Sequence, residues 1–310
     1  MNPIRKQFNS TSQFPFELVH KDRKHPQDEL PDHFHDWYEI VYVYHGCGTF
    51  FIDHTFYEMN KGDLFLIPGN TIHRAFPDSY DPVTSSALFF VPLIMQPANL
   101  GEVYSSLGCF EHAKKLKSYK LVIAEQDRNM LEGLIEAIHQ EEEQQQLGHR
   151  QAALLYLGQL LLCLNRGYTP DSVYKEDFNV GPIWMRQILQ YIDSNPVNEL
   201  SLAALSERAS VSAAHFSRVF KQLTGMNVTD YVIAKRIVLA KELLLQSDDN
   251  ISVIAEKSGF ESLPHFHRMF KKATGITPAK YKKYSDRNST EQMKFTEDKD
   301  KEANNKKPTA

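Results

Sequence analysis

The sequence is poor in cysteine and in long apolar runs. Its 310 residues contain three cysteines, Cys47, Cys109 and Cys163, at wide spacings and without a C-x-x-C pair. This argues against a disulfide framework and against a structural zinc site. The longest apolar run, residues 154–164, is too short to span a bilayer, and the first residues lack the apolar core of a signal peptide. We therefore expect a chain in the reducing cytoplasm, without a membrane as a partner.

Charge is unevenly distributed over a chain whose net charge is −4. Residues 1–181 carry 15 Lys and Arg against 24 Asp and Glu, whereas residues 182–284 carry 14 against 9. A basic segment behind an acidic one indicates that only the second part of the chain meets a polyanion.

The hydrophobic pattern predicts an α+β fold with separate parts. Short β-branched and aromatic runs from Leu18 to about Val91 are typical of a small β-barrel or sandwich, and helical spacing follows from about Glu125. A second helical region begins with a helix whose first residue is Pro182. The predicted parts are a barrel over residues 1–125, a helical pair over 126–166, a linker over 167–181, an all-α domain over 182–284, and a disordered tail over 285–310 that is nearly free of apolar residues.

The all-α domain carries one motif twice. Residues 215–225 read HFSRVFKQLTG and residues 265–275 read HFHRMFKKATG. In the units around these motifs, residues before the motif correspond at an offset of 49, and residues within it correspond at an offset of 50. The second unit therefore has one extra residue, which lies in the turn between its two helices. Ser212 and Ser262 are suited to cap the second helix of each unit, and Gly225 and Gly275 to end it. Each unit is therefore a predicted helix-turn-helix.

Two interpretations of the repeated units are open. They form either a helical scaffold with a solvated charged face or a pair of DNA-binding units, since their exposed groups can donate hydrogen bonds to bases and phosphates. A connecting helix from about Thr229 to Gln246 would run roughly 25 Å, which can place two helices in successive major grooves about 34 Å apart. The two copies favour DNA. The exposed groups are His215, Ser217, Arg218 and Lys221 in the first copy and His265, His267, Arg268, Lys271 and Lys272 in the second.

The segment GFESLPHFHRMFKKATGITPAKY, with the unit before it, resembles the AraC/XylS family of bacterial transcription regulators over residues 182–284. In that family the second helix of each unit contacts DNA. Carried over by position, the resemblance implies contacts from Ala213, Ala214, Ser217 and Arg218 in the first unit and from Leu263, Pro264, His265, His267 and Arg268 in the second. The first unit departs from the pattern, with Ser210-Val211 where the second has Gly259-Phe260.

The amino-terminal part contains a set of histidines with a carboxylate. His33, His35 and Glu39 stand at odd positions of one predicted strand and so project to one face, and His73 follows on a neighbouring strand. The spacing resembles the two cupin motifs, with Asn70 where cupins have Gly. Three imidazoles and a carboxylate could hold a metal ion. The alternative is direct binding of a small polar molecule, for which Trp37 offers an apolar plate.

Together these observations predict a transcription regulator, not an enzyme, that binds double-stranded DNA. We expect an activator with a small effector, a carbohydrate being favoured, bound by His33, His35, Trp37, Glu39 and His73 without a metal or other cofactor. The alternative is a cupin metalloenzyme or metal sensor that uses the three histidines and Glu39 as ligands. A homodimer is expected through the helical pair, and the family resemblance implies RNA polymerase as a partner. The stripe proposed for the dimer comprises Met130, Leu134, Ile138, Leu154, Leu157 and Leu161.

Overall fold

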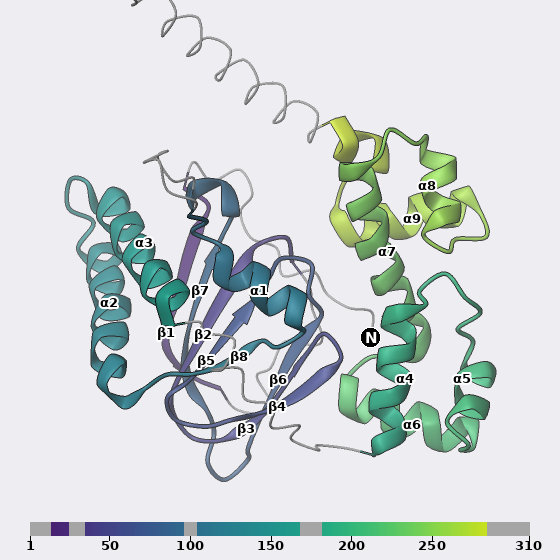
Figure 1. The fold of residues 1–310 in the computed structure, drawn as a ribbon, viewed down its shortest axis with the longest axis horizontal. Coiled ribbons are helices and arrows are strands. Elements are labelled where there is room, and N and C mark those ends of the chain that lie inside the picture. The colour runs from purple at the N-terminus through teal and green to yellow at the C-terminus, as the bar shows by residue number, and fades with distance from the viewer. Residues whose placement is uncertain (1–13, 25–34, 96–103, 168–181, 284–310) are drawn as a thin grey trace, which may run out of the picture.

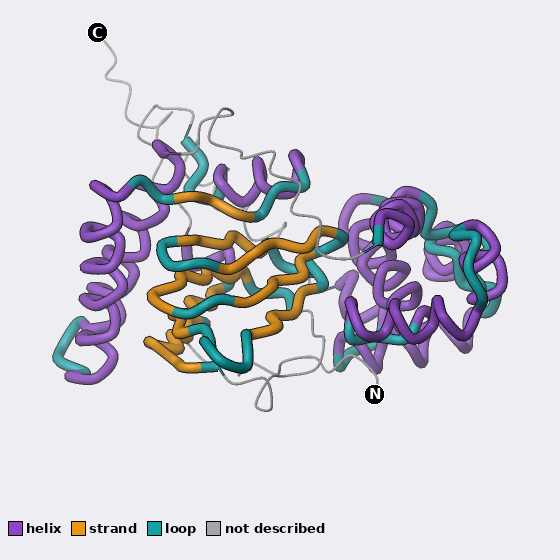
Figure 2. The backbone as a smooth tube through the Cα atoms, turned by 90° about the horizontal axis from the view of Figure 1, so that it is seen from below, coloured by secondary structure: helices purple, strands orange, loops and turns teal. Residues whose placement is uncertain are grey.

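The structure, a computed structural model, describes residues 14–24, 35–95, 104–167 and 182–283. His33, nearly all of the predicted linker and the whole predicted tail lie outside the described residues. Within the described residues, strands lie between a helical pair on one side and the carboxy-terminal helices on the other (Figures 1 and 2). The predicted α+β fold class is confirmed.

The described strands form two antiparallel sheets. The larger has the order β1-β7-β2-β5-β8 and the smaller the order β4-β3-β6. Both inner faces are lined by aromatic and β-branched residues, which pack into one core with the neighbouring helices. The bounds are β1 Phe16–Arg23, β2 Tyr38–His45, β3 Gly48–Ile52, β4 Thr55–Met59, β5 Asp63–Ile67, β6 His73–Pro77, β7 Thr84–Phe90 and β8 Lys120–Val122.

Strand β2 is buried on both faces, with the small sheet on one side and the helices on the other contributing to the same core. Glu39, Val41 and Val43 share one face, and the tyrosines at 42 and 44 share the other. Tyr42 Oη donates to Glu132 Oε1 of helix α2 at 2.7 Å, which fixes that helix over the large sheet. The strand begins at Tyr38, so the prediction that His35 lies on the same strand as Glu39 is wrong.

Helices α2 (Glu125–Gln144) and α3 (His149–Gly167) form the predicted pair, and α1 (Gly108–Leu116) packs beside them. Most of the stripe expected at a dimer interface is instead buried inside the chain, because these side chains pack between the pair and the sheet. The buried members are Leu134, Ile138, Leu157 and Leu161. Of the large apolar residues exposed on the pair, Met130 of the predicted stripe is 42 % exposed, and Leu155, which was not part of that stripe, is 66 % exposed.

The carboxy-terminal domain consists of two helix-turn-helix units joined by helix α7. Its helices are α4 Ile183–Ser194, α5 Leu202–Arg208, α6 Ala213–Thr224, α7 Val228–Gln246, α8 Ile251–Lys257 and α9 Leu263–Thr274, and residues 278–283 form a further helical turn. Pro182 is the residue that caps α4 and not its first residue, because its ψ of 143° is extended.

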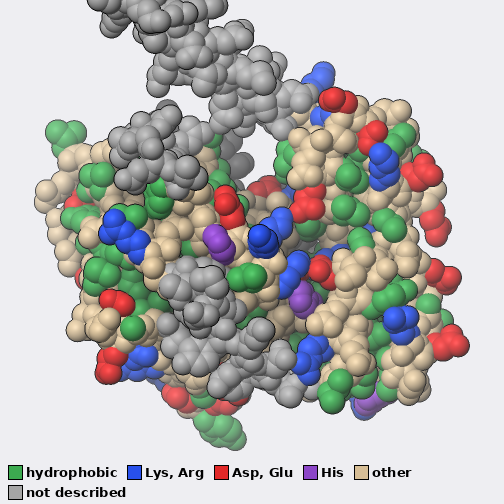
Figure 3. Space-filling model, in the orientation of Figure 1, with side chains coloured by type: hydrophobic (Ala, Val, Ile, Leu, Met, Phe, Trp, Pro, Cys, Tyr) green, Lys and Arg blue, Asp and Glu red, His purple; other side chains and the backbone are tan. Residues whose placement is uncertain are grey.

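Apolar and charged contacts join the two domains. Phe51, Phe56 and Ile72 of the small sheet and its loops belong to the same buried cluster as α4, α6 and the start of α7. Tyr231 Oη of α7 donates to the Asp53 carbonyl at 2.7 Å. Lys and Arg side chains gather with Asp and Glu along the line where the two domains meet (Figure 3). The barrel and the first helix-turn-helix unit thus share a core.

Candidate DNA interface and effector site

We call helices α6 and α9 the reading helices, because each is the second helix of its unit. Ser212 caps α6 by accepting a hydrogen bond from the His215 backbone at 3.3 Å, as predicted. Ser262 stands at the same position of α9, but its side chain makes no such bond. Gly225 and Gly275 end the two helices with φ of 76° and 79°, in the left-handed conformation that glycine adopts at no steric cost.

Each reading helix buries its paired phenylalanines and turns a polar face outward. Phe216 and Phe220 of α6, like Phe266 and Phe270 of α9, are fully buried. The predicted contact residues that are exposed are Ala213, Ala214, Arg218, Lys221, Leu263, Pro264, Arg268 and Lys271, and those that are half-buried are His215, Ser217, His265 and His267. The structure therefore places every predicted DNA-contacting side chain at least partly at the surface of its reading helix.

Cations and imidazoles dominate these two faces. In α6, Arg218 Nη2 donates to His215 Nδ1 at 3.2 Å, so the two side chains form one polar group on the surface. In α9, Lys271 and Lys272 lie in the last turn, where positive charge also complements the helix dipole. Groups of this kind contact phosphates and the acceptor edges of bases.

The turns before the reading helices differ as the sequence indicates. Gly259 has a φ of +84°, and a Cβ built on it would lie 3.0 Å from the Val197 Cα and 2.8 Å from Arg236 Nε. Ser210, the matching residue of the first unit, adopts a φ of 54° despite carrying a side chain. The same left-handed turn is therefore formed in both units, at a steric cost in the first.

Three side chains meet inside the barrel: His35 before β2, Glu39 on β2 and His73 at the start of β6. His35 Nε2 lies 3.1 Å and His73 Nε2 lies 3.0 Å from the same Glu39 oxygen, Oε2. All three residues are at most 4 % exposed. We call this group the triad. It contains three of the five predicted effector-binding residues, and of the other two, His33 lies outside the described residues.

Backbone carbonyls fix which imidazole nitrogens of the triad carry protons. His35 Nδ1 lies 2.8 Å from the Trp37 carbonyl oxygen, and His73 Nδ1 lies 2.9 Å from the Thr71 carbonyl oxygen. A carbonyl can only accept, so each Nδ1 donates, and the Nε2 of a neutral ring is an acceptor. Toward Glu39 a neutral ring thus presents an acceptor, and a protonated ring presents a donor. Such a group favours a bound donor, a cation or additional protons.

The pKa shifts of the triad also favour a bound donor or cation. Burial lowers the pKa of His35, and its hydrogen bond to Glu39 does not fully offset this. Burial alone would raise the pKa of Glu39, but the two neighbouring imidazoles outweigh it and hold that pKa well below its usual range. At neutral pH an ionised carboxylate therefore lies beside a neutral His35 ring.

The triad has the composition and spacing of a cation site as well as of a hydroxyl-binding site. Two ligand atoms about 2.1 Å from one ion at a right angle lie roughly 3.0 Å apart, and the two nitrogen–oxygen distances are 3.1 and 3.0 Å. Two histidines and one carboxylate on one side of an ion are a known ligand set for divalent transition metals. Nδ1–H donation to carbonyls is also typical of histidines that bind metals.

Trp37 contributes to the triad in a way that the sequence does not predict. Its backbone carbonyl orients His35, while its side chain is buried in the barrel core. The prediction that its ring provides a plate for a ligand stays a prediction.

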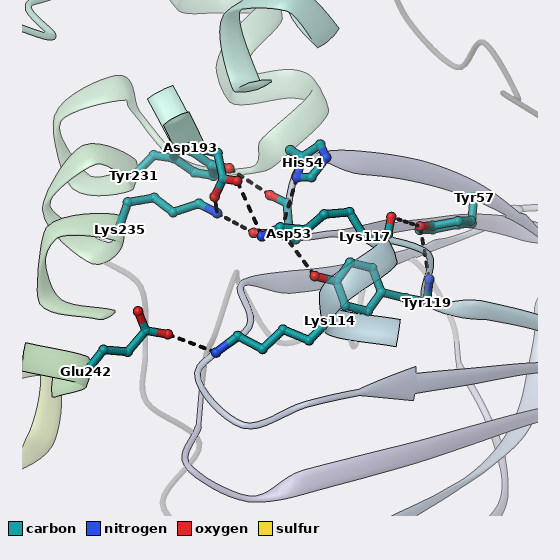
Figure 4. A network of polar contacts seen from close by, with 10 residues as sticks. All are labelled: Asp53, His54, Tyr57, Lys114, Lys117, Tyr119, Asp193, Tyr231, Lys235 and Glu242. Carbon is teal, nitrogen blue, oxygen red and sulfur yellow. Dashed lines mark hydrogen bonds and ion pairs between the residues drawn. The ribbon is translucent and has the colours of Figure 1, made fainter. Parts of the chain in front are cut away.

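Sequence reasoning missed a group of charged residues between the domains. Asp53, in the β3–β4 turn, pairs with Lys235 of α7 and with Lys117, and Lys235 also pairs with Asp193 of α4 at 2.8 Å (Figure 4). Although this cluster also contains His54, the two lysines supply the positive charge there, so it forms an ion-pair network. A signal was present: most residues of α7 are apolar, and Lys235 and Lys241 stand among them.

Comparisons with known proteins match both halves of the chain. The family described as "AraC-like ligand binding domain" matches residues 15–161, and the family described as "Helix-turn-helix domain" matches residues 205–284. The fold and the two matched domains define a DNA-binding transcription regulator with a ligand-binding domain. The chain is a member of the AraC/XylS family of regulators.

The relatives found are regulators as well. The HTH-type transcriptional activator RhaR of Escherichia coli O139:H28 (strain E24377A / ETEC) is 28 % identical over 265 residues, which cover 84 % of this chain and 89 % of that protein. RhaR of Shigella flexneri matches with the same identity and coverage. Among solved structures, ToxT from Vibrio cholerae O395 is 13 % identical with a TM-score of 0.35, covering 86 % of this chain and 95 % of that one.

No helix among the described residues is both long enough and apolar enough to cross a membrane. The three cysteines, all within the described residues, are free thiols, which agrees with the absence of a disulfide framework that the sequence predicts.

Proposed function

We propose that this chain activates transcription in response to a small polar effector, a carbohydrate being the favoured class, bound at the triad. The observation that carries the regulatory part is the pair of exposed polar reading helices held on one connecting helix. Support for activation comes from the curated relatives, which are named as transcriptional activators. DNA contact is assigned to the exposed residues of α6 and α9, and RNA polymerase is the partner that the family resemblance implies.

The chemistry of the triad supports a carbohydrate. The Glu39 carboxylate can accept from a sugar hydroxyl, and an imidazole Nε2 can accept from a hydroxyl when the ring is neutral and donate to one when the ring is protonated. In Glu39→Gln the amide can donate to one imidazole nitrogen, so the variant satisfies part of the group without any ligand.

Calorimetry of the full chain against a panel of hexoses and pentoses tests this proposal. We expect one sugar class to bind the wild type and to bind Glu39→Gln at least tenfold more weakly. The duplex for the DNA measurement is selected by the protein itself from a random library, and the bound sugar should change the affinity for it. A panel in which no sugar binds the wild type would refute the carbohydrate effector.

A second candidate function, cation binding by the triad, is favoured by its ligand spacing. It predicts that the purified chain carries one equivalent of a divalent transition metal and that chelation abolishes effector binding. The direct-binding proposal predicts substoichiometric metal and effector affinity that survives chelation. Elemental analysis before and after dialysis against a chelator therefore separates the two.

We also propose that the chain forms a homodimer through the outer side of the helical pair. Met130 and Leu155 are large apolar residues exposed on this pair, and a second copy of the chain would cover them. Sedimentation of the full chain at micromolar concentration should give a dimer, and Leu155→Glu should shift it to monomer. Monomer behaviour of the wild type would remove the dimer from the proposal.

A further inference from the structure

Two charged contacts between the domains lie at different positions along helix α7. The Asp53 network lies at the turn of the small sheet and holds α7 through Lys235 (Figure 4). Six residues further along the same helix, Lys241 extends to the barrel and contacts the side-chain oxygens of Asp36 and Asn70. Lys241 is 2 % exposed, so its ammonium group is held almost entirely by the protein. The second contact bears directly on the triad.

Asp36 and Asn70 belong to the two loops that carry the triad histidines. Asp36 follows His35 directly, and the hydrogen bond from His35 Nδ1 to the Trp37 carbonyl closes the chain around it. The backbone N–H of Asn70 donates to the His35 carbonyl at 2.7 Å. Its chain neighbour Gly69 packs so tightly on Asp36 that an added Cβ would lie 2.4 Å from the Asp36 carbonyl oxygen.

The second loop reaches the other histidine within the next residues. The Thr71 carbonyl, one residue after Asn70, accepts the proton of His73 Nδ1. Each histidine is thus oriented by a backbone carbonyl, and the residue just before that carbonyl's residue has a side chain that contacts Lys241. The oxygens that contact the Lys241 ammonium group therefore lie on the same short segments that orient the two rings.

On its other side Lys241 leads to the second reading helix. Its ammonium group lies 5.7 Å from the centre of the Tyr281 ring, and that ring packs edge-on against Phe270 of α9 at a centroid distance of 5.5 Å. Phe270 is fully buried and lies in the apolar stripe that sets the position of α9. A continuous set of contacts therefore runs from the triad loops to a reading helix.

We propose that Lys241 couples the state of the triad to the DNA affinity of the second helix-turn-helix unit, an inference that rests on the effector site of the proposed function. The loops and α7 meet there through one buried cation with oxygen partners on both loops. Loss of an oxygen partner from a buried cation is costly. When a change at the triad moves one of these oxygens, Lys241 therefore follows it, and α7 or the Tyr281 contact shifts with Lys241. The Asp53 network acts as the fixed attachment about which this shift occurs.

A double-mutant cycle on the full chain tests the coupling without a known effector. Glu39→Gln is the change at the triad, Lys241→Met removes the ammonium group while keeping the apolar stem, and affinity is measured on a selected duplex by fluorescence anisotropy. We expect Glu39→Gln alone to change the DNA dissociation constant by about 5-fold or more, in the range usual for allosteric coupling. In the Lys241→Met background the same change should have less than about a twofold effect.

The neighbouring residue provides a matched control. Glu242 forms a separate ion pair between α7 and the barrel domain, with Lys114 at 2.8 Å, and both of these side chains are well exposed. Glu242→Gln should leave the effect of Glu39→Gln at its wild-type size. Asp36→Asn, which acts from the loop side, should reduce that effect as Lys241→Met does, and thermal melting of each variant checks that it folds.

The outcomes separate this inference from the proposed function. Additive effects of Glu39→Gln and Lys241→Met on DNA affinity would overturn the coupling, and so would an unchanged affinity in Glu39→Gln alone. The sugar calorimetry of the wild type decides the proposed function independently, since it involves neither DNA nor Lys241. A loss of coupling in Glu242→Gln equal to that in Lys241→Met would also count against a specific role for Lys241.

Discussion

At the scale of single residues, the two helix-turn-helix units differ most at the left-handed turn residue. Ser210 holds a φ of 54°, which costs a residue with a Cβ roughly 1 kcal/mol, whereas Gly259 holds a φ of 84° without that cost. We expect Ser210→Gly to raise the free energy of unfolding by up to about 1 kcal/mol. Gly259→Ala should lower it by about 1–3 kcal/mol, since the new Cβ meets the Val197 backbone. Urea denaturation measures the free energy of unfolding of both variants. A change of this free energy in the same direction in both would contradict the difference in strain between Ser210 and Gly259.

Arg268 is the single side chain whose loss should weaken DNA binding most clearly. It is exposed on α9 while Phe266 and Phe270 hold the helix in place. Arg268→Ala should weaken binding to the selected duplex by roughly 1–3 kcal/mol without changing the melting temperature. Lys257→Ala is the control, because it removes a positive charge from α8 where Lys257 pairs with Asp249 at 2.7 Å. Equal losses in the two variants would indicate a general effect of charge only.

Sequence patterns predict residues well where a local rule decides the conformation. The caps at Ser212, Gly225 and Gly275 follow from backbone hydrogen bonding and from glycine's freedom at positive φ. His35 meets Glu39 although the predicted reason was wrong, because His35 precedes β2 and approaches the carboxylate from a loop and not from the same strand. The partners of Lys241 do not follow from a local rule, because Asp36 and Asn70 lie more than 170 residues away and only the packing of the two domains brings them together.

At the scale of elements, helix α2 carries an unfavourable carboxylate near its carboxy-terminal end. Burial and then the charges of Glu17 and Glu143 raise the pKa of Glu142 to about 7. An acid with a raised pKa in the folded state favours folding only while protonated, so stability is lost as pH rises from about 4.5 to about 7. Glu142→Gln should therefore be more stable than the wild type at pH 8 and equally stable near pH 4.5. Thermal melting across this range tests it.

The control for this prediction is Glu141→Gln, the preceding residue of the same helix. Its melting temperature should follow the pH profile of the wild type. If Glu142→Gln keeps the wild-type dependence of melting temperature on pH, the half-buried Glu142 carboxylate is not the cause of that dependence.

Elements were predicted best where their pattern was long. The repeated helices and the helical pair lie where the period of the sequence indicates, and α7 begins one residue before its predicted start. The use of the pair's apolar stripe was predicted wrongly, because a stripe shows that a face is buried but not whether a sheet or a second chain covers it. The start of β2 was also misplaced, since the alternation that predicts a strand continues into a turn that precedes it.

At the scale of the whole molecule, one helix serves three tasks. Helix α7 joins the two helix-turn-helix units, shares a core with the barrel through Tyr231, and receives the triad loops at Lys241. Its 19 residues span roughly 28 Å, which with the flanking turns suits two reading helices about one turn of DNA apart. A regulator built in this way can present two DNA-contacting helices from one chain and adjust one of them from the barrel.

DNA contact through both helix-turn-helix units is tested most directly by a hydroxyl-radical footprint of the full chain on its selected duplex. The footprint is repeated with Arg218→Ala and Arg268→Ala. We expect two protected segments about one helical turn apart, roughly 10 base pairs from centre to centre. Each variant should lose protection of one segment and keep the other, since each arginine lies on a different reading helix. A single protected segment, or two variants that lose the same segment, would contradict a chain that contacts DNA through both helix-turn-helix units.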